Sequence, residues 1–353
     1  MHITHIIPTL SFGGAERTVV DIINTCSKDF SFSVIVFFPS LELQSQISKK
    51  NVPVQVVQKN GQISLHLIGD IQTALKTLQT DVVHTHLFGG DVWGRIAAHE
   101  LGLPVVTTEH NINKAEGEIK SFVKRCLNSY TQKYVACSDS VATYMKRTYK
   151  IRKSIQVIRP GIALERFSKA KPRSFSSPLR LVIVGRLEQQ KGHEIALRAL
   201  ARIPASEWRL TIVGNGSLES SLKDLCVSLD IGNNVSFEQG TANIQKVFAD
   251  HDVVLIPSKW EGLGMVALEA MASGCMVIAS NVGGLPEVIQ HKKTGLLVNA
   301  TAKDFMSAIQ QCLKNREQMK QMAERAQEYA SEHFSVQSMA RAYENIYKSV
   351  KRS

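Results

Sequence analysis

Short runs of β-branched and apolar residues alternate with amphipathic stretches along most of the chain, and this pattern constrains the fold more than any other feature. Two sets of candidate strands are separated by a break: residues 2–7, 33–38, 54–57, 81–86, 105–109, 134–137 and 156–158, then 180–184, 209–213, 234–237, 252–256, 276–279 and 295–298. Several runs are almost wholly apolar, which is typical of strands buried on both faces of a parallel sheet. The alternation predicts two doubly wound α/β domains.

The domain boundaries follow from the break between the two sets. Residues 167–178 are rich in Ser, Pro and basic residues and lack periodicity, which is typical of a linker. We expect a first domain over residues 1–166 and a second over 179–335, a division that suits a chain of 353 residues. From about residue 302 the chain reads as helices only, and the last helix, about 336–353, is expected to pack back on the first domain. Because such sheets bind ligands at the carboxyl ends of their strands, the two domains are expected to face each other across a cleft.

Composition and cysteine usage exclude several other classes of protein. The chain is 44% hydrophobic and 21% charged, as is usual for a globular protein. Its start carries no signal-peptide pattern, and no apolar run approaches the length of a transmembrane helix. The six cysteines are scattered without a C-x-x-C pair, so a structural zinc site or a disulfide framework is not expected and a reducing cytoplasm fits.

The net charge of +11 is concentrated in one part of the chain. Residues 110–173 contain fifteen Lys or Arg and four Asp or Glu, so the remainder is close to neutral. This excess favours an anionic partner such as a membrane surface, a phosphorylated lipid or nucleic acid, with a solvated surface as the alternative. Residues 119–127 can form a helix that pairs an apolar with a cationic face, as in proteins that lie on membranes. Nucleic acid is disfavoured because the stretch has only scattered aromatic residues and no recognisable module.

The segment after Pro257 holds the strongest pattern for a binding site. A strand ends near Pro257, a glycine-bearing loop follows, and a helix is expected from about Gly264. The free N–H groups of a helix start bind anions, and Gly262 and Gly264 allow a ligand to approach the backbone closely. Glu261 lies in the loop. Glu269 follows one to two turns into the helix, where an acceptor-only carboxylate suits a vicinal diol such as that of a ribose.

This segment resembles the E-x7-E motif of the retaining glycosyltransferases of family 4, in the GT-B superfamily, and similar features run through the whole chain. The resemblance implies the GT-B fold of two Rossmann-like domains and the transfer of a sugar from a nucleoside diphosphate. By position, Glu261 would contact hydroxyls of the donor sugar and Glu269 the nucleotide ribose. The backbone expected to contact the donor is that of Gly262, Leu263, Gly264 and Met265.

A pair of cations precedes the first helix of the second domain. The strand at 180–184 is followed by Arg186 and Lys191, whose planar fork and point charge both match a diphosphate. Such a pair neutralises a leaving nucleoside diphosphate without a metal, and the family has an Arg and a Lys at this place. Gly214, in a turn after the next strand, is expected near the nucleotide base, and Gly283 and Gly284 near the cleft wall. All three glycines are equally explained as turns.

Two segments of the first domain complete the expected donor site. Gly13 and Gly14 lie between the first strand and a helix, where they permit either a tight turn or the close approach of a ligand. In the family this loop closes over the donor phosphates. His110 follows the strand at 105–109 and is either an ordinary loop histidine or faces the cleft. Similar enzymes carry a His near the donor sugar here, so we expect His110 to position the sugar rather than act as a general base.

Two further patterns are weaker candidates for metal sites. Asp250 and Asp252 have the D-x-D spelling of metal-dependent glycosyltransferases, but they lie where a helix ends and a strand begins. They are therefore not expected to converge on one ion. His84 and His86 lie on one face of a strand, but no third ligand follows at a suitable spacing, so we expect them to line the core or the cleft.

The sequence therefore predicts a retaining glycosyltransferase of the hexosyltransferase type (EC 2.4), with no metal and no cofactor besides its sugar donor. A UDP-sugar is favoured as donor, and the acceptor is expected in bacterial lipopolysaccharide, O-antigen, capsule or glycolipid synthesis. The expected location is the cytoplasm, with peripheral contact of residues 110–173 to the inner face of the plasma membrane. The alternatives are a non-catalytic regulator that binds nucleotide sugars or anions, and a GT-B phosphorylase or hydrolase.

Overall fold

The computed structural model describes residues 1–58, 66–113, 117–167, 175 and 177–351, and it divides into two compact units. The first unit comprises Met1–Gly161 and Val336–Ser353, and the second comprises Ile162–Ser335. The sequence places the end of the first segment at 166, whereas in the structure the N–H of Ile162 already donates to the carbonyl oxygen of Phe334 at 2.8 Å, within the second unit. Of the expected linker at 167–178, residues 168–174 and 176 lie outside the described residues.

The first unit is built on a parallel sheet of seven strands, counted over the described residues, in the order β3-β2-β1-β4-β5-β6-β7. The order runs outward in both directions from β1 and β4, as in a doubly wound domain. This confirms the predicted fold class. The strands are β1 (His2–Ile6), β2 (Ser31–Val36), β3 (Val54–Val56), β4 (Val82–His86), β5 (Val105–Glu109), β6 (Lys133–Ala136) and β7 (Ile155–Val157).

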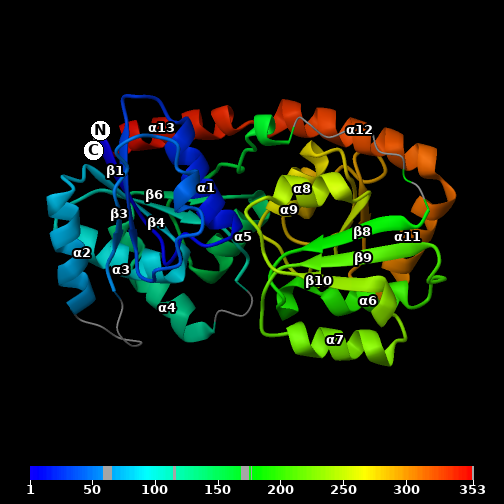
Figure 1. Cartoon of the computed structure of the whole chain (residues 1–353). Coiled ribbons are helices and arrows are strands. Elements are labelled where there is room, and N and C mark those ends of the chain that lie inside the picture. The colour runs from blue at the N-terminus through cyan, green and yellow to red at the C-terminus, as the bar shows by residue number, and fades with distance from the viewer. Residues whose placement is uncertain (59–65, 114–116, 168–174, 176, 352–353) are drawn as a thin grey trace. The chain divides into compact units, whose positions relative to one another are not determined.

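Helices from both ends of the chain cover the first sheet (Figure 1). They are α1 (Gly14–Thr25), α2 (His66–Thr77), α3 (Leu87–Glu100), α4 (Glu118–Cys126), α5 (Asp139–Thr148) and α13 (Val336–Lys351). The last helix, α13, lies beside α1, and two of its tyrosines reach polar groups of the sheet. Tyr347 Oη lies 2.8 Å from His84 Nδ1, and Tyr343 Oη lies 3.3 Å from Thr108 Oγ1. The helix therefore completes the core of the first unit.

The second unit repeats the architecture with a six-stranded parallel sheet in the order β10-β9-β8-β11-β12-β13, again over the described residues. Its strands are β8 (Leu179–Val184), β9 (Trp208–Val213), β10 (Val235–Glu238), β11 (Val253–Ile256), β12 (Met276–Ser280) and β13 (Leu296–Val298). Its helices are α6 (His193–Leu200), α7 (Glu219–Ser228), α8 (Ile244–Asp250), α9 (Met265–Ala272), α10 (Leu285–Val288), α11 (Ala302–Lys314) and α12 (Arg316–His333). In Figure 1, α8 and α9 lie on one face of this sheet and α6 and α7 on the other. No helix in the described part of the chain is both long and apolar enough to cross a membrane.

The core of the second unit explains why its strands are continuous apolar runs. Leu181 and Ile183 of β8 and Val253 and Leu255 of β11 are all buried in one cluster. Trp208 of β9 is fully buried, and its indole N–H donates to the carbonyl oxygen of Ile203 at 3.2 Å. Because helices cover both faces, alternation with polar residues is not needed in these strands.

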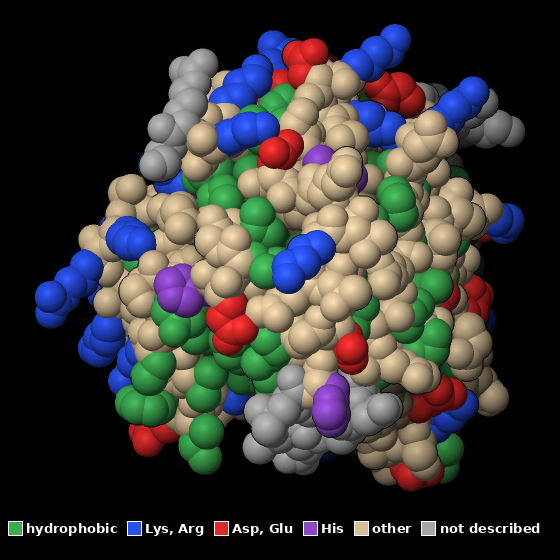
Figure 2. Space-filling model, turned by 90° about the vertical axis from the view of Figure 1, so that its left-hand side faces the viewer, with side chains coloured by type: hydrophobic (Ala, Val, Ile, Leu, Met, Phe, Trp, Pro, Cys, Tyr) green, Lys and Arg blue, Asp and Glu red, His purple; other side chains and the backbone are tan. Residues whose placement is uncertain are grey.

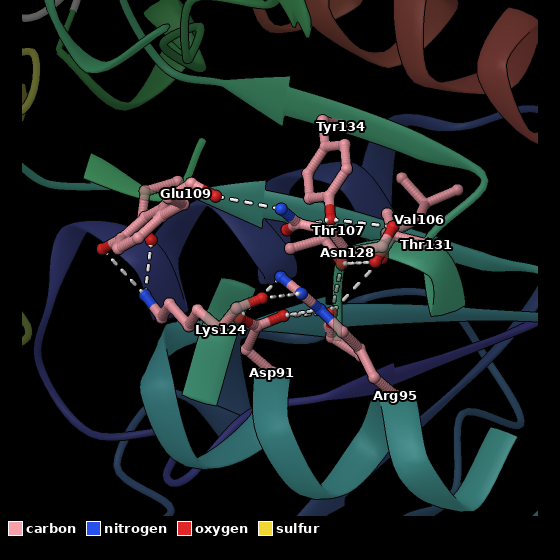
Figure 3. A network of polar contacts seen from close by, with 11 residues as sticks. Asp91, Arg95, Val106, Thr107, Glu109, Lys124, Asn128, Thr131 and Tyr134 are labelled. Atoms are coloured by element: carbon pink, nitrogen blue, oxygen red, sulfur yellow. Dashed lines mark hydrogen bonds and ion pairs between the residues drawn. The ribbon is translucent and has the colours of Figure 1, made fainter. Parts of the chain in front are cut away.

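A buried ion pair ties α4 to the end of β5 in the first unit (Figure 3). Lys124 Nζ lies 2.7 Å from Glu109 Oε2 and donates to Tyr149 Oη at 3.1 Å, and the Asn113 side chain donates to Glu109 Oε1 at 3.1 Å. Lys124 is only 1% exposed. It is one of the cations counted in the basic stretch 110–173, so that count overstates the charge available to a partner.

Replacement of Lys124 by Met is expected to lower the free energy of unfolding by about 3–5 kcal/mol, because it leaves the Glu109 carboxylate buried without its counter-charge. Urea denaturation at neutral pH measures the change. The double variant with Glu109→Gln should recover much of the loss, since no buried charge remains. Lys223→Met, in an exposed i,i+4 pair with Glu219, is the matched control and should cost about 0–1 kcal/mol. Equal costs for the two single variants would contradict the importance of burial.

Candidate functional site

Loops that follow β8, β9, β11 and β12 lie together at one edge of the second sheet. β11 pairs with β8 on one side and with β12 on the other, and all pairs are parallel. The carboxyl ends of these strands therefore share an edge, which is where doubly wound sheets bind ligands. The second-unit residues that the sequence assigns to the donor lie in these loops or in the first turns of α9: Arg186, Lys191, Gly214, Glu261, Gly262, Leu263, Gly264, Met265 and Glu269.

An ion pair joins two of these loops. Lys191 Nζ, after β8, lies 2.5 Å from Glu261 Oε1, after β11, and Ser258 Oγ donates to the same oxygen at 2.8 Å. The Lys191 side chain is 19% exposed and that of Glu261 is 9% exposed. A cation and a carboxylate that the sequence assigns separately, to a diphosphate and to a sugar, are thus in direct contact.

Gln190 is a residue of this site that the sequence did not reveal. Its side-chain N–H donates to the carbonyl oxygen of Trp260 at 3.0 Å, and its own carbonyl oxygen accepts from the N–H of Lys259 at 2.8 Å. The exposed guanidinium of Arg186 lies 3.4 Å from Gln190 Oε1. Gln190 is buried and fixes the loop after β8 against the loop after β11. Its only sequence signal is its place directly before Lys191.

The start of α9 depends on two glycines. Gly264 is the N-cap residue with a φ of 96°, a left-handed conformation that favours glycine, and a Cβ there would lie 2.5 Å from the Leu285 side chain. At Gly283, with a φ of 56°, a Cβ would lie 2.0 Å from the carbonyl oxygen of Glu261. Gly283 therefore holds the Glu261 loop in place. Gly262 and Leu263 are buried, whereas Met265 and Glu269 are half-buried and keep part of their surface exposed.

Gly214 has a different explanation from the predicted contact with a nucleotide base. A Cβ at this position would lie 2.0 Å from the carbonyl oxygen of Gly185, so the glycine allows the loops after β8 and β9 to touch. The contact itself accounts for the glycine and leaves the base-binding role a prediction.

His193 is a second residue that the sequence analysis did not single out. It opens α6, two residues after Lys191, and is 2% exposed. Neither ring nitrogen has a hydrogen-bond partner among the described residues. Burial, with a smaller effect of the Lys191 charge, lowers the pKa of His193 to about 4, so the ring is neutral at pH 7.

The first unit holds the other predicted residues at the carboxyl edge of its own sheet. Gly13 is the N-cap of α1 and Gly14 its first residue, and both are exposed. His110 follows β5 and is half-buried. Burial lowers the pKa of His110 to about 4, so its imidazole is neutral at pH 7.

A third histidine joins His84 and His86 in the fold, although no third ligand follows them at a suitable spacing in the sequence. His5, from β1, brings a ring nitrogen to within 4.8 Å of ligand atoms of both. The sequence shows no such spacing because β1 and β4 are neighbours only in the folded sheet. Both nitrogens of His84 are hydrogen-bonded, to Tyr347 and to Thr108, so a metal ion would have to displace a protein partner. This favours a core of hydrogen-bonded histidines over a metal centre.

Asp250 and Asp252 have separate cationic partners. Asp252 is fully buried and its two oxygens lie 2.7–3.1 Å from donors of Arg180. Asp250 Oδ2 lies 2.8 Å from Lys246 Nζ. The two carboxylates hold different elements together and do not converge on one point.

Two hollows of the second unit lie away from these loops. One, of about 380 Å³, is lined by residues that include Pro204 and Lys314, and the other, of about 310 Å³, by residues that include Lys292 and Ser307. Neither is lined by a predicted site residue. The chemistry of the carboxyl edges, rather than hollow size, identifies the candidate site.

The chain is similar to several known proteins in sequence and in fold. A D-inositol 3-phosphate glycosyltransferase of Rhodococcus opacus is 31% identical over 288 residues, which are 72% of this chain and 64% of that protein, so the chain spans less than two thirds of that relative. An uncharacterized 41.2 kDa protein in the cps region of Klebsiella pneumoniae is 26% identical and aligns over 99% of this chain and 100% of its own length. The crystal structure of Anabaena HepE in complex with UDP-glucose superposes with a TM-score of 0.89 at 23% identity, covering 99% of this chain and 100% of that chain.

Models of two protein families match successive parts of the chain. The model of Glycosyltransferase Family 4 matches residues 12–166, and that of Glycosyl transferases group 1 matches residues 165–329. The two matches together cover every strand of both parallel sheets except β1, and all of the predicted site residues. With two doubly wound parallel-sheet domains and the fold of solved GT-B structures, the chain belongs to the family 4, group 1 glycosyltransferases of the GT-B superfamily.

Proposed function

We propose that the protein transfers a sugar from a nucleoside diphosphate sugar, with a UDP-sugar as the favoured donor, to a hydroxyl of a glycan or lipid-linked acceptor. The anomeric configuration is retained, and neither a metal nor another cofactor takes part. In this proposal Arg186 and Lys191 bind the diphosphate, Glu261 binds the sugar and Glu269 binds the ribose. Gly14 and His110 of the first unit keep the donor-contacting roles that the sequence predicts.

The ion pair between Lys191 and Glu261 is the observation that carries the proposal. A single oxygen of Glu261 accepts from both Lys191 and Ser258, which leaves the other carboxylate oxygen for sugar hydroxyls. Lys191 has three donors on its ammonium group, and it lies at the ligand-binding edge of the sheet. A diphosphate held there would lie beside the positive charge of Lys191, and the sugar attached to it would contact the carboxylate of Glu261.

The chemistry that follows is mainly electrostatic. Negative charge grows on the leaving diphosphate as the bond to the sugar breaks, and fixed cations placed beside it stabilise that charge. The sequence offers no carboxylate that is evidently placed as a nucleophile, and Glu261 itself is paired with Lys191. We therefore favour attack of the acceptor on the face from which the phosphate leaves. Detection of a covalent glycosyl–enzyme adduct by mass spectrometry would count against this route.

The named ligands and relatives support the choice of donor and pathway. The matched HepE structure holds UDP-glucose, and the Klebsiella relative is encoded in a cps region. These names favour a UDP-sugar and an acceptor in bacterial surface-polysaccharide or glycolipid synthesis. We place the reaction at the cytoplasmic face of the membrane, where such donors are made available.

A thermal-shift measurement tests the nucleotide site. UDP at about 100 times its dissociation constant should stabilise the protein by about 2.7 kcal/mol, because it binds only the folded state. The stabilisation should persist in excess EDTA and be absent in Glu269→Ala, which removes the proposed ribose acceptor. Glu219→Ala, an exposed carboxylate on α7, is the control and should respond like the unaltered protein. Absence of a shift with UDP, GDP and ADP, from folded protein, would favour a non-catalytic regulator or an enzyme that binds its acceptor first.

Lys191→Met should lower the turnover number about 10²–10³-fold, the loss usual when one fixed group that stabilises developing charge is removed. The assay measures the UDP that is released from UDP-glucose, with a membrane fraction added as the source of the acceptor. Lys259→Met is the control. Lys259 directly follows Ser258, has no predicted role and pairs with Glu194, so this variant should keep its turnover. Release that needs no acceptor would indicate a hydrolase, and release that requires inorganic phosphate a phosphorylase.

The surface of α4 supports a peripheral contact with a membrane. Ile119 is 81% exposed and Phe122 is 61% exposed, one turn apart on the helix. Lys120 and Arg125 are also exposed beside them, whereas Ser121 and Lys124 face inward. Figure 2 views a face of the first unit on which Lys and Arg side chains and exposed hydrophobic side chains are interspersed. Exposed apolar groups flanked by cations suit an anionic lipid surface.

Cosedimentation with vesicles tests this contact. Vesicles that contain phosphatidylglycerol should bind the protein at low salt, and the double variant Ile119→Ser/Phe122→Ser should bind several-fold more weakly. Val227→Ser, a 77% exposed apolar residue on α7, is the matched control and should not weaken binding. Vesicles of phosphatidylcholine alone should bind poorly, because they carry no net negative charge to attract the Lys and Arg side chains. If the protein does not bind these vesicles, or if the double variant binds them equally well, the proposed contact between α4 and the membrane is wrong.

A further inference from the structure

Four histidines lie on neighbouring strands of the first sheet, three of them inside it and His110 at its carboxyl edge. The parallel register places His5 of β1 opposite His84 of β4, and His86 of β4 opposite Thr108 of β5. Residues two apart on a strand share a face, so His84 and His86 project on the same side. His110 follows Thr108 by two residues, directly after β5 ends.

Three of these rings form a continuous chain of hydrogen bonds. His110 Nε2 lies 2.9 Å from His86 Nδ1, and His86 Nε2 lies 2.9 Å from His5 Nδ1. The chain ends at His5 Nε2, which is buried and has no partner among the described residues. His84 lies beside the chain, with its ring 4.1 Å from that of His86, but both of its nitrogens bond elsewhere.

Burial keeps these rings neutral. His5 and His86 are fully buried. Loss of solvent lowers the pKa of His5 to about 3 and that of His110 to about 4, and it lowers the pKa of His86 well below its ordinary value. At pH 7 each ring therefore carries one N–H and one bare nitrogen.

One proton per ring leaves two arrangements for the chain, because each bridge needs one donor and one acceptor. If His5 Nδ1 carries the proton, it donates to His86 Nε2, and His86 Nδ1 donates to His110 Nε2. His110 then carries its own proton on Nδ1. In the opposite arrangement every proton sits on Nε2, and the bridges run from His110 towards His5.

The buried end of the chain favours the first arrangement. In the second, an N–H of His5 is buried with no acceptor, and orphaned buried N–H groups are rarer than under-satisfied acceptors. In the first, the unpartnered atom is the bare His5 Nε2. We infer that His5 and His86 are positioning residues that hold His110 in its Nδ1–H form, so that His110 donates a hydrogen bond to an oxygen of the bound ligand.

This arrangement limits what His110 does. A protonated Nδ1 donates and cannot remove a proton, so His110 orients an acceptor oxygen (a hydroxyl, carbonyl or carboxylate) rather than serving as a general base. The chain conducts no proton onward, because His5 Nε2 meets no partner in the described residues. That the oxygen belongs to a sugar donor rests on the proposed function. The tautomer of His110 does not.

Long-range ¹H–¹⁵N correlation spectra of the full chain, labelled with ¹⁵N-histidine at pH 7, test the inference directly. Protonated and bare ring nitrogens have well-separated ¹⁵N shifts, so each tautomer can be assigned. We expect the Nδ1–H form for His5, His86 and His110. An Nε2–H form at His110, or shifts averaged between the two forms, would overturn the inference.

Two variants separate positioning from general structural effects. His86→Phe removes the donor to His110 Nε2, and the His110 nitrogens should then move to averaged or Nε2–H shifts. His84→Phe alters a ring packed on His86 but outside the chain, and it should leave the His110 shifts as they are. If His86→Phe does not fold, the tautomers of His5, His86 and His110 in the wild-type protein alone test the inference.

Metal analysis of the same sample covers the competing explanation. One equivalent of zinc, with metal-shifted nitrogens in His5, His84 and His86, would overturn the hydrogen-bonded chain. UDP lacks the sugar that His110 is proposed to contact, so the UDP thermal shift should be the same in His86→Phe as in the unaltered protein. A missing UDP shift would contradict the proposed function and leave the tautomer result unaffected.

Discussion

The parallel pairing of β8, β11 and β12 brings the loops after these strands to one edge of the second sheet, and the proposed donor site depends on this pairing. The register aligns Val253 with Leu181 and Ile256 with Ala279. It is held by strands that are buried on both faces, where a shift of one residue would exchange the side chains that pack on the two faces. Lys191 and Glu261 come within 2.5 Å only because their strands are neighbours. The glycines of the loops then let backbone pack against backbone around this pair.

The central strands of the first unit bury polar side chains, so the stability of this unit depends on the hydrogen bonds that these side chains form. Thr4, His5, His84, His86 and Thr108 are all buried on β1, β4 and β5. A buried polar group without a partner costs about 1–3 kcal/mol. His84 and Thr108 bond to each other and to the tyrosines of α13, and His5 bonds to His86. Thr4 bonds to Ser33 and Thr80, whereas His5 Nε2 has no partner among the described residues. This explains why a helix from the end of the chain belongs to the first unit, and it explains how an ordered row of imidazoles can persist in a core.

Much of the fold follows from local patterns in the sequence. Every predicted strand is present, and the strand at residues 105–109 has the predicted bounds. Strong apolar runs separated by glycine-bearing loops have few alternatives in a chain of this length. The loop that carries Glu261 and the helix that carries Glu269 were predictable for the same reason. Gln190 and His5 were not, because each bonds to residues far away in the sequence. Lys124 looked like a surface cation and is buried, since only the packing of α4 against β5 brings it to Glu109.

The sequence by itself determined the two doubly wound domains, the family and the positions of the charged groups along the chain, because these depend on periodicity and on motifs of adjacent residues. The tertiary structure alone decided which of those groups meet. Strand order and register, which no local pattern encodes, pair Lys191 with Glu261, give Asp250 and Asp252 different cations, and place His5 next to His86. Hydrogen bonds and ion pairs act over a few ångströms of space, so their partners are set by the fold and not by distance along the chain.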